Sequence, residues 1–183
     1  MTSLIVIAKP LFILIFTEKW LSAVPYFQLL ALAGVLTPIH AFNLNIFKIY
    51  NRTDLFLKLG LIKVVMVAAA LSIGVLFGIY GLLYAIVCSS ILGILINTYP
   101  SEKLINYSTK QQLKDLFPIV MYAILSFLSG SLVLELVKKY HVVIQVLLGS
   151  TITSVIFVTS AIGTKSKSLV EVKYLINSIL KRT

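Results

Sequence analysis

Four polar side chains that could bind or position another molecule lie within apolar stretches of this sequence: His40, Asn43, Asn45 and Lys63. In a helix, a spacing of three places His40 and Asn43 on neighbouring parts of one face, whereas Asn45 points elsewhere. Imidazole and amide groups in an apolar segment need hydrogen-bond partners, on neighbouring helices or in a watery cavity. Two interpretations of these three residues follow, a structural hydrogen bond between helices and a contact with a substrate.

Lys63 lies nine residues past Asp54, which is about 13 Å along a helix. A lone ammonium group at that depth is costly unless its side chain extends back to the membrane surface or faces an aqueous cavity. In the first interpretation the Lys63 side chain extends to the membrane surface. In the second, Lys63 is a cation on the path of an anionic substrate. Lys58 is close enough to the interface for the first interpretation. The candidate binding residues are therefore Lys63, His40, Asn43 and Asn45.

No pattern of residues indicates an enzyme. The sequence has no Gly-rich phosphate loop, helical HExxH or CxxC motif, and its single Cys88 forms no disulfide framework. We expect no catalytic residue, no metal site and no cofactor. A carboxylate deep in a span usually marks a proton or sodium relay, which counts here against cation-coupled export. All acidic residues fall in or near connectors: Glu18, Asp54, Glu102, Asp115, Glu135 and Glu171.

The elements that must hold these residues are membrane-spanning helices. From Val64 to Asn97 there are 34 residues without a charged side chain, interrupted only by Gly78-Ile79-Tyr80-Gly81. A hydrocarbon core about 30 Å thick needs roughly 20 apolar residues of helix, so this run predicts two spans joined by a short turn. In the whole sequence 59% of residues are hydrophobic and 12% charged, against about 25% charged in soluble domains. We expect an all-α, polytopic transmembrane helix bundle.

The bundle should occupy residues 1–163. Thr37-Pro38 in the first span predicts a kink, because proline removes a backbone donor. The segment 3–17 is short and carries Lys9-Pro10, so it reads as a partial or kinked helix. A polar connector is expected over 99–116. The five full spans are expected at 25–48, 55–77, 82–98, 117–137 and 142–163.

The basic residues indicate which way the spans run. The net charge of +10 comes from residues between the apolar runs, which favours contact with anionic lipid heads over binding to nucleic acid. By the positive-inside rule, the side with most Lys and Arg is cytoplasmic, as is the C-terminus. The opposite side has three, Lys19, Lys138 and Lys139. The cytoplasmic side has twelve of the 16: Lys48, Arg52, Lys58, Lys63, Lys103, Lys110, Lys114, Lys165, Lys167, Lys173, Lys181 and Arg182.

The tail 164–183 is too polar to be a span. Leu169, Val172, Ile176 and Ile179 repeat at helical spacing within it, flanked by basic residues. This pattern predicts a basic amphipathic helix on the cytoplasmic membrane face. The alternative is a frayed basic end without fixed structure.

Three segments follow one another in a recognisable order. Residues 10–20 read PLFILIFTEKW, residues 34–38 read GVLTP and lead to Asn43-Leu-Asn45, and residues 51–59 read NRTDLFLKL. This order resembles the carboxy-terminal half of Wzx-type polysaccharide flippases, in the multidrug, oligosaccharidyl-lipid and polysaccharide exporter superfamily. Family members commonly show Gly-Glu-Lys-Trp in the first segment and Gly-Arg-Ser-Asp in the third, where this chain has Thr17 and Asn51 at the glycine positions. The turn Gly78-Ile-Tyr-Gly81 is also similar to the family, and beyond residue 100 the likeness is one of hydropathy.

The resemblance implies a transporter with two six-helix lobes around a central cavity, often with two further carboxy-terminal helices. On that plan segment 3–17 corresponds to helix nine and the five spans to helices ten to fourteen. The chain is then the carboxy-terminal lobe, a fragment that begins at an internal or alternative Met1, and its partner is a missing amino-terminal lobe. The implied activity is the flipping of a polyprenyl-diphosphate-linked oligosaccharide across the bacterial plasma (inner) membrane, in lipopolysaccharide or other cell-surface polysaccharide biosynthesis. Lys63 is the candidate for pairing with the diphosphate.

Two other functions stay open from the sequence. One is export of drugs or other small molecules by the same superfamily, against which the missing intramembrane acid counts. The other is a membrane subunit that does not itself transport.

Overall fold

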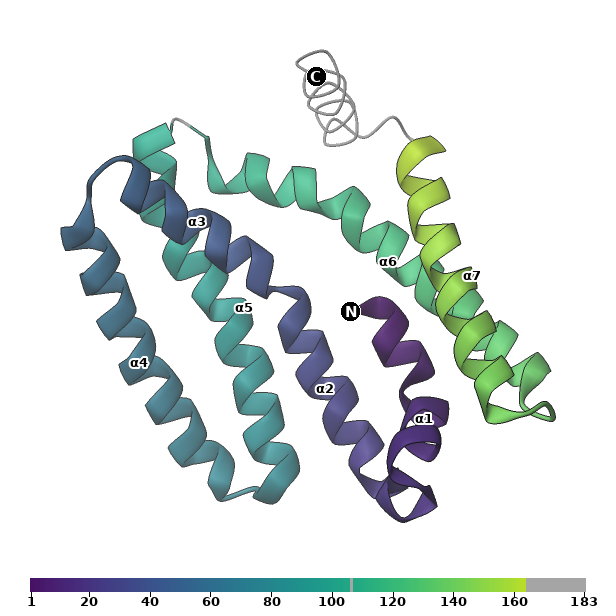
Figure 1. Ribbon diagram of the computed structural model, residues 1–183. Helices are drawn as coiled ribbons and strands as arrows, with labels where there is room; N and C mark the ends of the chain where they lie inside the picture. Colours follow the sequence, from purple (N-terminus) through teal and green to yellow (C-terminus); the bar gives the residue numbers. More distant parts are fainter. Residues whose placement is uncertain (106, 164–183) are drawn as a thin grey trace, which may run out of the picture.

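A computed structural model describes residues 1–105 and 107–163, and in these residues the regular structure is helical throughout (Figure 1). The tail predicted for 164–183 lies outside the described residues. The elements are α1 (Thr2–Phe16), the 3-10 helix η1 (Glu18–Ala23), α2 (Val24–Val35), α3 (Thr37–Ile49), α4 (Thr53–Val75), α5 (Gly78–Ile105), α6 (Thr109–Val137) and α7 (Val142–Gly163).

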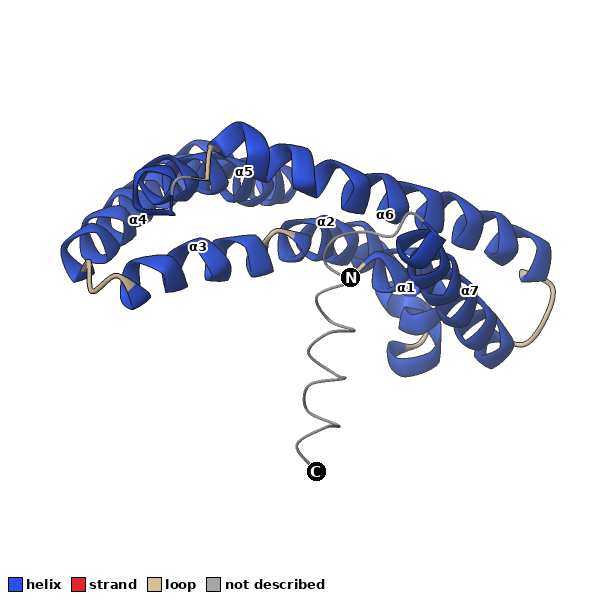
Figure 2. Cartoon of the chain, turned by 90° about the horizontal axis from the view of Figure 1, so that it is seen from above, coloured by secondary structure: helices blue, strands red, loops and turns tan. Residues whose placement is uncertain are grey.

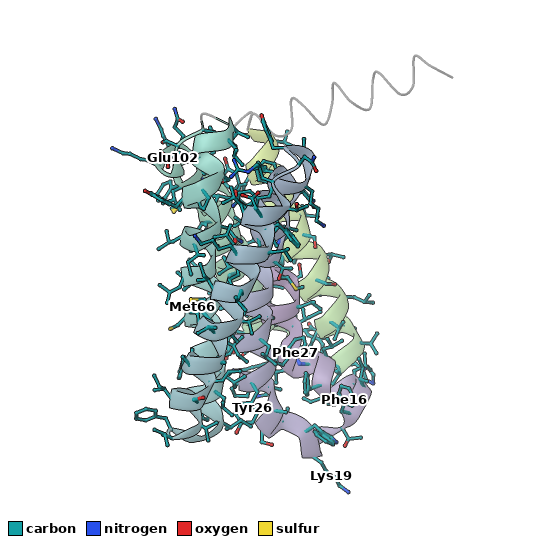
Figure 3. The ribbon with its side chains drawn as sticks, turned by 90° about the vertical axis from the view of Figure 1, so that its left-hand side faces the viewer. Phe16, Lys19, Tyr26, Phe27, Met66 and Glu102 are labelled. Atoms are coloured by element: carbon teal, nitrogen blue, oxygen red, sulfur yellow. The ribbon has the colours of Figure 1, made fainter. Side chains whose placement is uncertain are left out.

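Five helical segments are long and apolar enough to cross a membrane: Glu18–Ile49, Thr53–Val75, Gly78–Glu102, Lys110–Val137 and Val142–Gly163. Their side chains are largely exposed apolar groups, as expected of helices that face lipid. Figure 3 shows Lys19 at one end of the bundle, Glu102 at the other and Met66 between them. We call these the Lys19 end and the Glu102 end. The chain is an all-α transmembrane helix bundle, which confirms the fold class predicted from the sequence.

The bundle consists of three helical hairpins. Helices α1 and α2 are joined through η1, α4 packs on α5, and α6 packs on α7. The hairpins meet where α5 packs against α2 and α3, and where α1 packs against α6 and α7. Seen from above, α4, α5 and α6 lie along one side, with α3, α2, α1 and α7 along the other (Figure 2). Helix α5 therefore holds α3 and α4 together.

The first full span breaks where the sequence places proline. Helix α2 ends at Val35, and α3 begins at Thr37 with Pro38 in its first turn. Pro38 has no N–H to donate to the carbonyl four residues back. The Leu36 carbonyl restarts the hydrogen-bond pattern by accepting from the backbone N–H of His40 at 3.3 Å. The break sets the direction of α3, and hence which residues of α3 meet α5.

Helices α5 and α6 extend into 99–116, where the sequence analysis expected a polar connector. Helix α5 continues through Pro100 to Ile105, and α6 begins at Thr109. The start of α6 is a capping box, in which Ser108 Oγ accepts from the Gln111 backbone N–H and the Gln111 side chain accepts from the Ser108 N–H. Polar composition indicated the membrane boundary here, but helical hydrogen bonding does not stop at that boundary.

The turn between α4 and α5 depends on two glycines. Gly78 has a φ of +71°, a conformation in which a side chain is strained. At Gly81 a Cβ atom would collide with the Gly74 carbonyl oxygen and lie 2.6 Å from the Phe77 Cβ. The tight turn and the close α4–α5 contact at the Lys19 end therefore require Gly78-Ile79-Tyr80-Gly81.

Candidate functional site

A set of polar side chains joins α3 to α5 near the Glu102 end. Asn43 is fully buried, its amide nitrogen donates to Thr98 Oγ1 at 3.3 Å, and its carbonyl oxygen accepts from Ser101 Oγ at 3.0 Å. The Thr98 hydroxyl donates in turn to the Ile94 carbonyl at 2.7 Å. These bonds satisfy both ends of the Asn43 amide within the protein. They make Asn43 an interhelical hydrogen-bonding residue, the first of the two interpretations drawn from the sequence.

One turn away, His40 and Asn97 form a second contact that is less completely satisfied. His40 Nδ1 lies 3.3 Å from Asn97 Nδ2. Asn97 is fully buried, and its Oδ1 has no hydrogen-bond partner in the described part of the protein. A Cβ at Gly93 would lie 3.0 Å from His40 Cε1, so the imidazole needs a glycine opposite it. The Asn97 oxygen can therefore accept a further hydrogen bond, whereas the nitrogen and the oxygen of the Asn43 amide both have partners.

Lys63 lies on α4, which packs against both α3 and α5. Its side chain is half-buried, unlike those of its neighbours Ile62 and Val64. Side chains on a helix tilt toward the helix N-terminus, which for α4 is the Glu102 end. The tilt favours the interpretation in which the Lys63 ammonium group extends to the membrane surface. The half-burial favours the interpretation in which Lys63 belongs to the site. Lys58, by contrast, is exposed.

The structure separates Asn45 from the other three candidates. Asn45 is exposed and makes no side-chain hydrogen bond to the described residues, in agreement with the expectation that it points elsewhere. His40 and Asn43 lie on one face against α5, and Lys63 lies on the neighbouring helix α4.

The sequence analysis missed the α5 side of the cluster. Gly93, Asn97 and Ser101 repeat at a spacing of four, which places them on one helical face. That spacing is visible in the sequence, but assigning 99–116 to a connector removed Ser101 from the helix. A search for polar residues at helical spacing across the predicted end of the span would have found this face.

Ion pairs and hydrogen bonds of charged groups occur at the ends of the helices. Arg52 pairs with Asp54 at 2.9 Å at the start of α4, and this bond raises the pKa of the Arg52 guanidinium. Lys138 pairs with Glu135 at the α6–α7 turn. Lys48 lies 5.3 Å from the centre of the Phe56 ring. Between the ends, Lys63 is half-buried on α4, and α4 packs against α3, which carries His40.

In the described ranges, no group of three or more His, Cys, Asp or Glu side chains could hold a metal ion. The donors and acceptors of the site are amides, hydroxyls, an imidazole and an ammonium group, which suit hydrogen bonding and anion pairing. Fold and site together define a multi-pass, all-α membrane protein with a polar contact between α3 and α5. Comparisons with models of protein families, with curated proteins and with solved structures found no match.

Proposed function

We propose that this chain is the carboxy-terminal part of a Wzx-type flippase that moves a polyprenyl-diphosphate-linked oligosaccharide across the bacterial inner membrane. The proposal starts from the resemblance of residues 10–59 and 78–81 to that family. Cell-surface polysaccharide biosynthesis, the amino-terminal lobe as partner and a cytoplasmic C-terminus belong to the same proposal.

The observation that best supports the proposal is the backbone conformation at the family's glycine positions. In the described part of the chain, positive φ occurs at Thr17 (74°), Asn51 (52°) and Gly78 (71°). Thr17 and Asn51 stand where family members commonly have glycine, and Gly78 opens the similar turn. Glycine is the residue favoured at positive φ. The family pattern thus has its glycines where this chain needs left-handed backbone, although two of the residues here are not glycine.

The cluster around Lys63 suits such a substrate. A diphosphate and a hydrophilic sugar must pass hydrocarbon while the polyprenyl tail stays in lipid. A hydrated, cationic surface between two lobes lowers that barrier, and alternating access opens it to each side in turn. Lys63 supplies a charge for the diphosphate, and His40, half-buried on the neighbouring α3, supplies a polar group.

The test is export by variants of the protein in its full-length, native form. Lys63→Gln should reduce polysaccharide export at least about tenfold, the effect of removing a charge-assisted contact worth about 1.4 kcal/mol or more. Its membrane abundance should stay near wild type. Lys63→Arg should keep part of the export, because the charge remains while its geometry changes. Lys58→Gln, an exposed lysine of the same helix, is the matched control and should export normally.

Four outcomes separate the proposal from its alternatives. Normal export by Lys63→Gln would show that Lys63 extends to the surface and does not contact substrate. Loss of both export and abundance would assign Lys63 a structural contact. Unchanged polysaccharide synthesis on deletion of the whole gene, with altered drug resistance, would favour the small-molecule exporter, and no change in either would favour a non-transporting subunit.

A further inference from the structure

Lys9 lies in the middle of α1 and points away from the rest of the described protein. Its sequence neighbours Ala8 and Pro10 are both buried, whereas Lys9 itself is exposed. Successive residues of a helix lie about 100° apart, so Lys9 stands on an open strip of α1 between two buried neighbours, while Leu4, Leu14 and Ile15 are exposed on other sides of the helix. The remaining sides of the helix contact α2, α6 and α7.

The surroundings of Lys9 are apolar. Ile5, Phe12, Ile13 and Phe16 share or border its face by helical spacing. The Phe12 ring contacts those of Phe16 and of Phe27 of α2 in tilted pairs, with ring centroids 5.4 Å apart in each. Neither ion pair found between described residues includes Lys9. The open face is therefore an apolar strip with one cation at its centre.

The ammonium group of Lys9 cannot readily reach the surface at the Lys19 end. Lys9 is seven residues from Phe16, about 10 Å along the helix. The Cα–Cβ bonds of α1 tilt toward its N-terminus, which points into the bundle and away from η1. Lys63 differs, because its tilt on α4 directs it to the nearer surface. Lys9 is thus directed toward the membrane interior.

A cation in this position needs an anionic partner. Exposure to lipid is expensive for an ammonium group. An aqueous path would be lined by polar groups, whereas Ile5, Ile13 and Phe16 are apolar. We propose that a further membrane helix carrying an Asp or Glu packs on this strip of α1 and forms an ion pair with Lys9. The apolar residues of the strip then contact the same helix, and charge complementarity fixes its register. This inference does not depend on the exported substrate.

A carbodiimide can convert the proposed ion pair into a covalent amide bond. A membrane-permeant carbodiimide activates a carboxyl group, the amine of a contacting lysine displaces the urea leaving group, and an amide bond remains. Native membranes containing the full-length protein, treated with dicyclohexylcarbodiimide, should give a cross-linked peptide pair that joins Lys9 to an Asp or Glu of a membrane helix. The Lys138–Glu135 ion pair provides the positive control in the same digest. Lys9→Arg keeps the charge but cannot form this product, and the cross-link should disappear in that variant.

The identity of the second peptide names the helix and shows whether it belongs to the same polypeptide or to another chain, and either result supports the proposal. Recovery of the Lys138–Glu135 cross-link without any from Lys9 would overturn it. Rapid labelling of Lys9→Cys by a membrane-impermeant thiol reagent would also overturn it, because the strip would then face water. Loss of export in the Lys63 variants has no bearing on either result, so this inference and the proposed function fail separately.

Discussion

Two contacts between helices in this protein are built in opposite ways. Where α3 meets α5, amide and hydroxyl groups of Asn43, Thr98 and Ser101 bond across the contact. Where α1 meets α6 and α7, glycines bring the backbones close. A Cβ at Gly130 of α6 would collide with Thr153 Oγ1, and one at Gly149 of α7 would lie 2.8 Å from the Ile7 Cγ2.

The two contacts have different roles. The contact of α1 with α6 and α7 supports the fold, whereas the contact of α3 with α5 keeps polar groups that can bind another molecule. Lipid supplies little hydrophobic drive for helices to associate, so close packing and hydrogen bonds must provide it. The small-residue contact has no room for another group. The polar contact includes a histidine and one amide oxygen without a partner in the described residues, and Lys63 is half-buried on the adjoining α4. We therefore expect changes at the first contact to act on stability, and changes beside Lys63 to act on function.

The largest stability effect is expected at Gly130. In Gly130→Ala the new methyl group meets Thr153 Oγ1, which is held by its hydrogen bond to the Gly149 carbonyl at 2.6 Å, and lies 3.1 Å from the Val6 Cγ1. Overpacking of this kind costs about 1–3 kcal/mol, measurable as a lower thermal midpoint in detergent. Gly60→Ala is the control, because a Cβ there has no neighbour within 4 Å. Equal stability of the two variants would mean that α1, α6 and α7 are not packed closely.

A smaller effect is expected at Asn43. Asn43→Leu keeps a similar volume but removes both hydrogen bonds to α5, and interhelical hydrogen bonds in membranes contribute about 0.6–1.7 kcal/mol. The Thr98 and Ser101 hydroxyls keep their bonds to backbone carbonyls, which limits the loss. Asn45→Leu, on the exposed face of the same helix, should leave the unfolding midpoint unchanged. A loss above that of Gly130→Ala would reverse the order of the two contacts.

The smallest effect is expected at Asn97, although it is as buried as Asn43. Asn97→Leu removes one long contact of 3.3 Å to His40 and also removes a buried oxygen without a partner. Removing an unsatisfied polar atom offsets the lost bond, so the free energy of unfolding should change by less than about 0.5 kcal/mol. A loss as large as that of Asn43→Leu would show that the Asn97 oxygen has a partner outside the described residues.

Local sequence was sufficient to predict much of this architecture. Apolar run length predicted the spans because bilayer thickness and helical rise are fixed quantities. Thr37-Pro38 predicted the break after Val35, because the missing proline N–H acts within one turn of helix. The sequence analysis did not predict that α5 and α6 extend into 99–116. Helical hydrogen bonds also form outside lipid, and polar composition alone does not indicate where they end.

Only part of the candidate site could be predicted from the sequence. His40, Asn43 and Lys63 were visible as polar residues in apolar runs, but the sequence left open whether they bind each other, neighbouring helices or a substrate. Asn97, Thr98 and Ser101 became the partners of His40 and Asn43 because α5 packs on α3 at that level. The exposure of Lys9 likewise depends on which sides of α1 are covered by α2, α6 and α7.

Apolar length, Thr37-Pro38 and the glycine turn by themselves determined that the chain folds as membrane helices, that the first span breaks after Val35, and that α4 turns tightly into α5. These signals act over one or two turns of backbone. Tertiary packing alone decided that Asn43 is satisfied while the Asn97 oxygen is not, that Lys63 is half-buried, and that Lys9 is left facing outward. The physical reason is that a side chain's partners depend on the rotation and depth of neighbouring helices, which no single helix specifies.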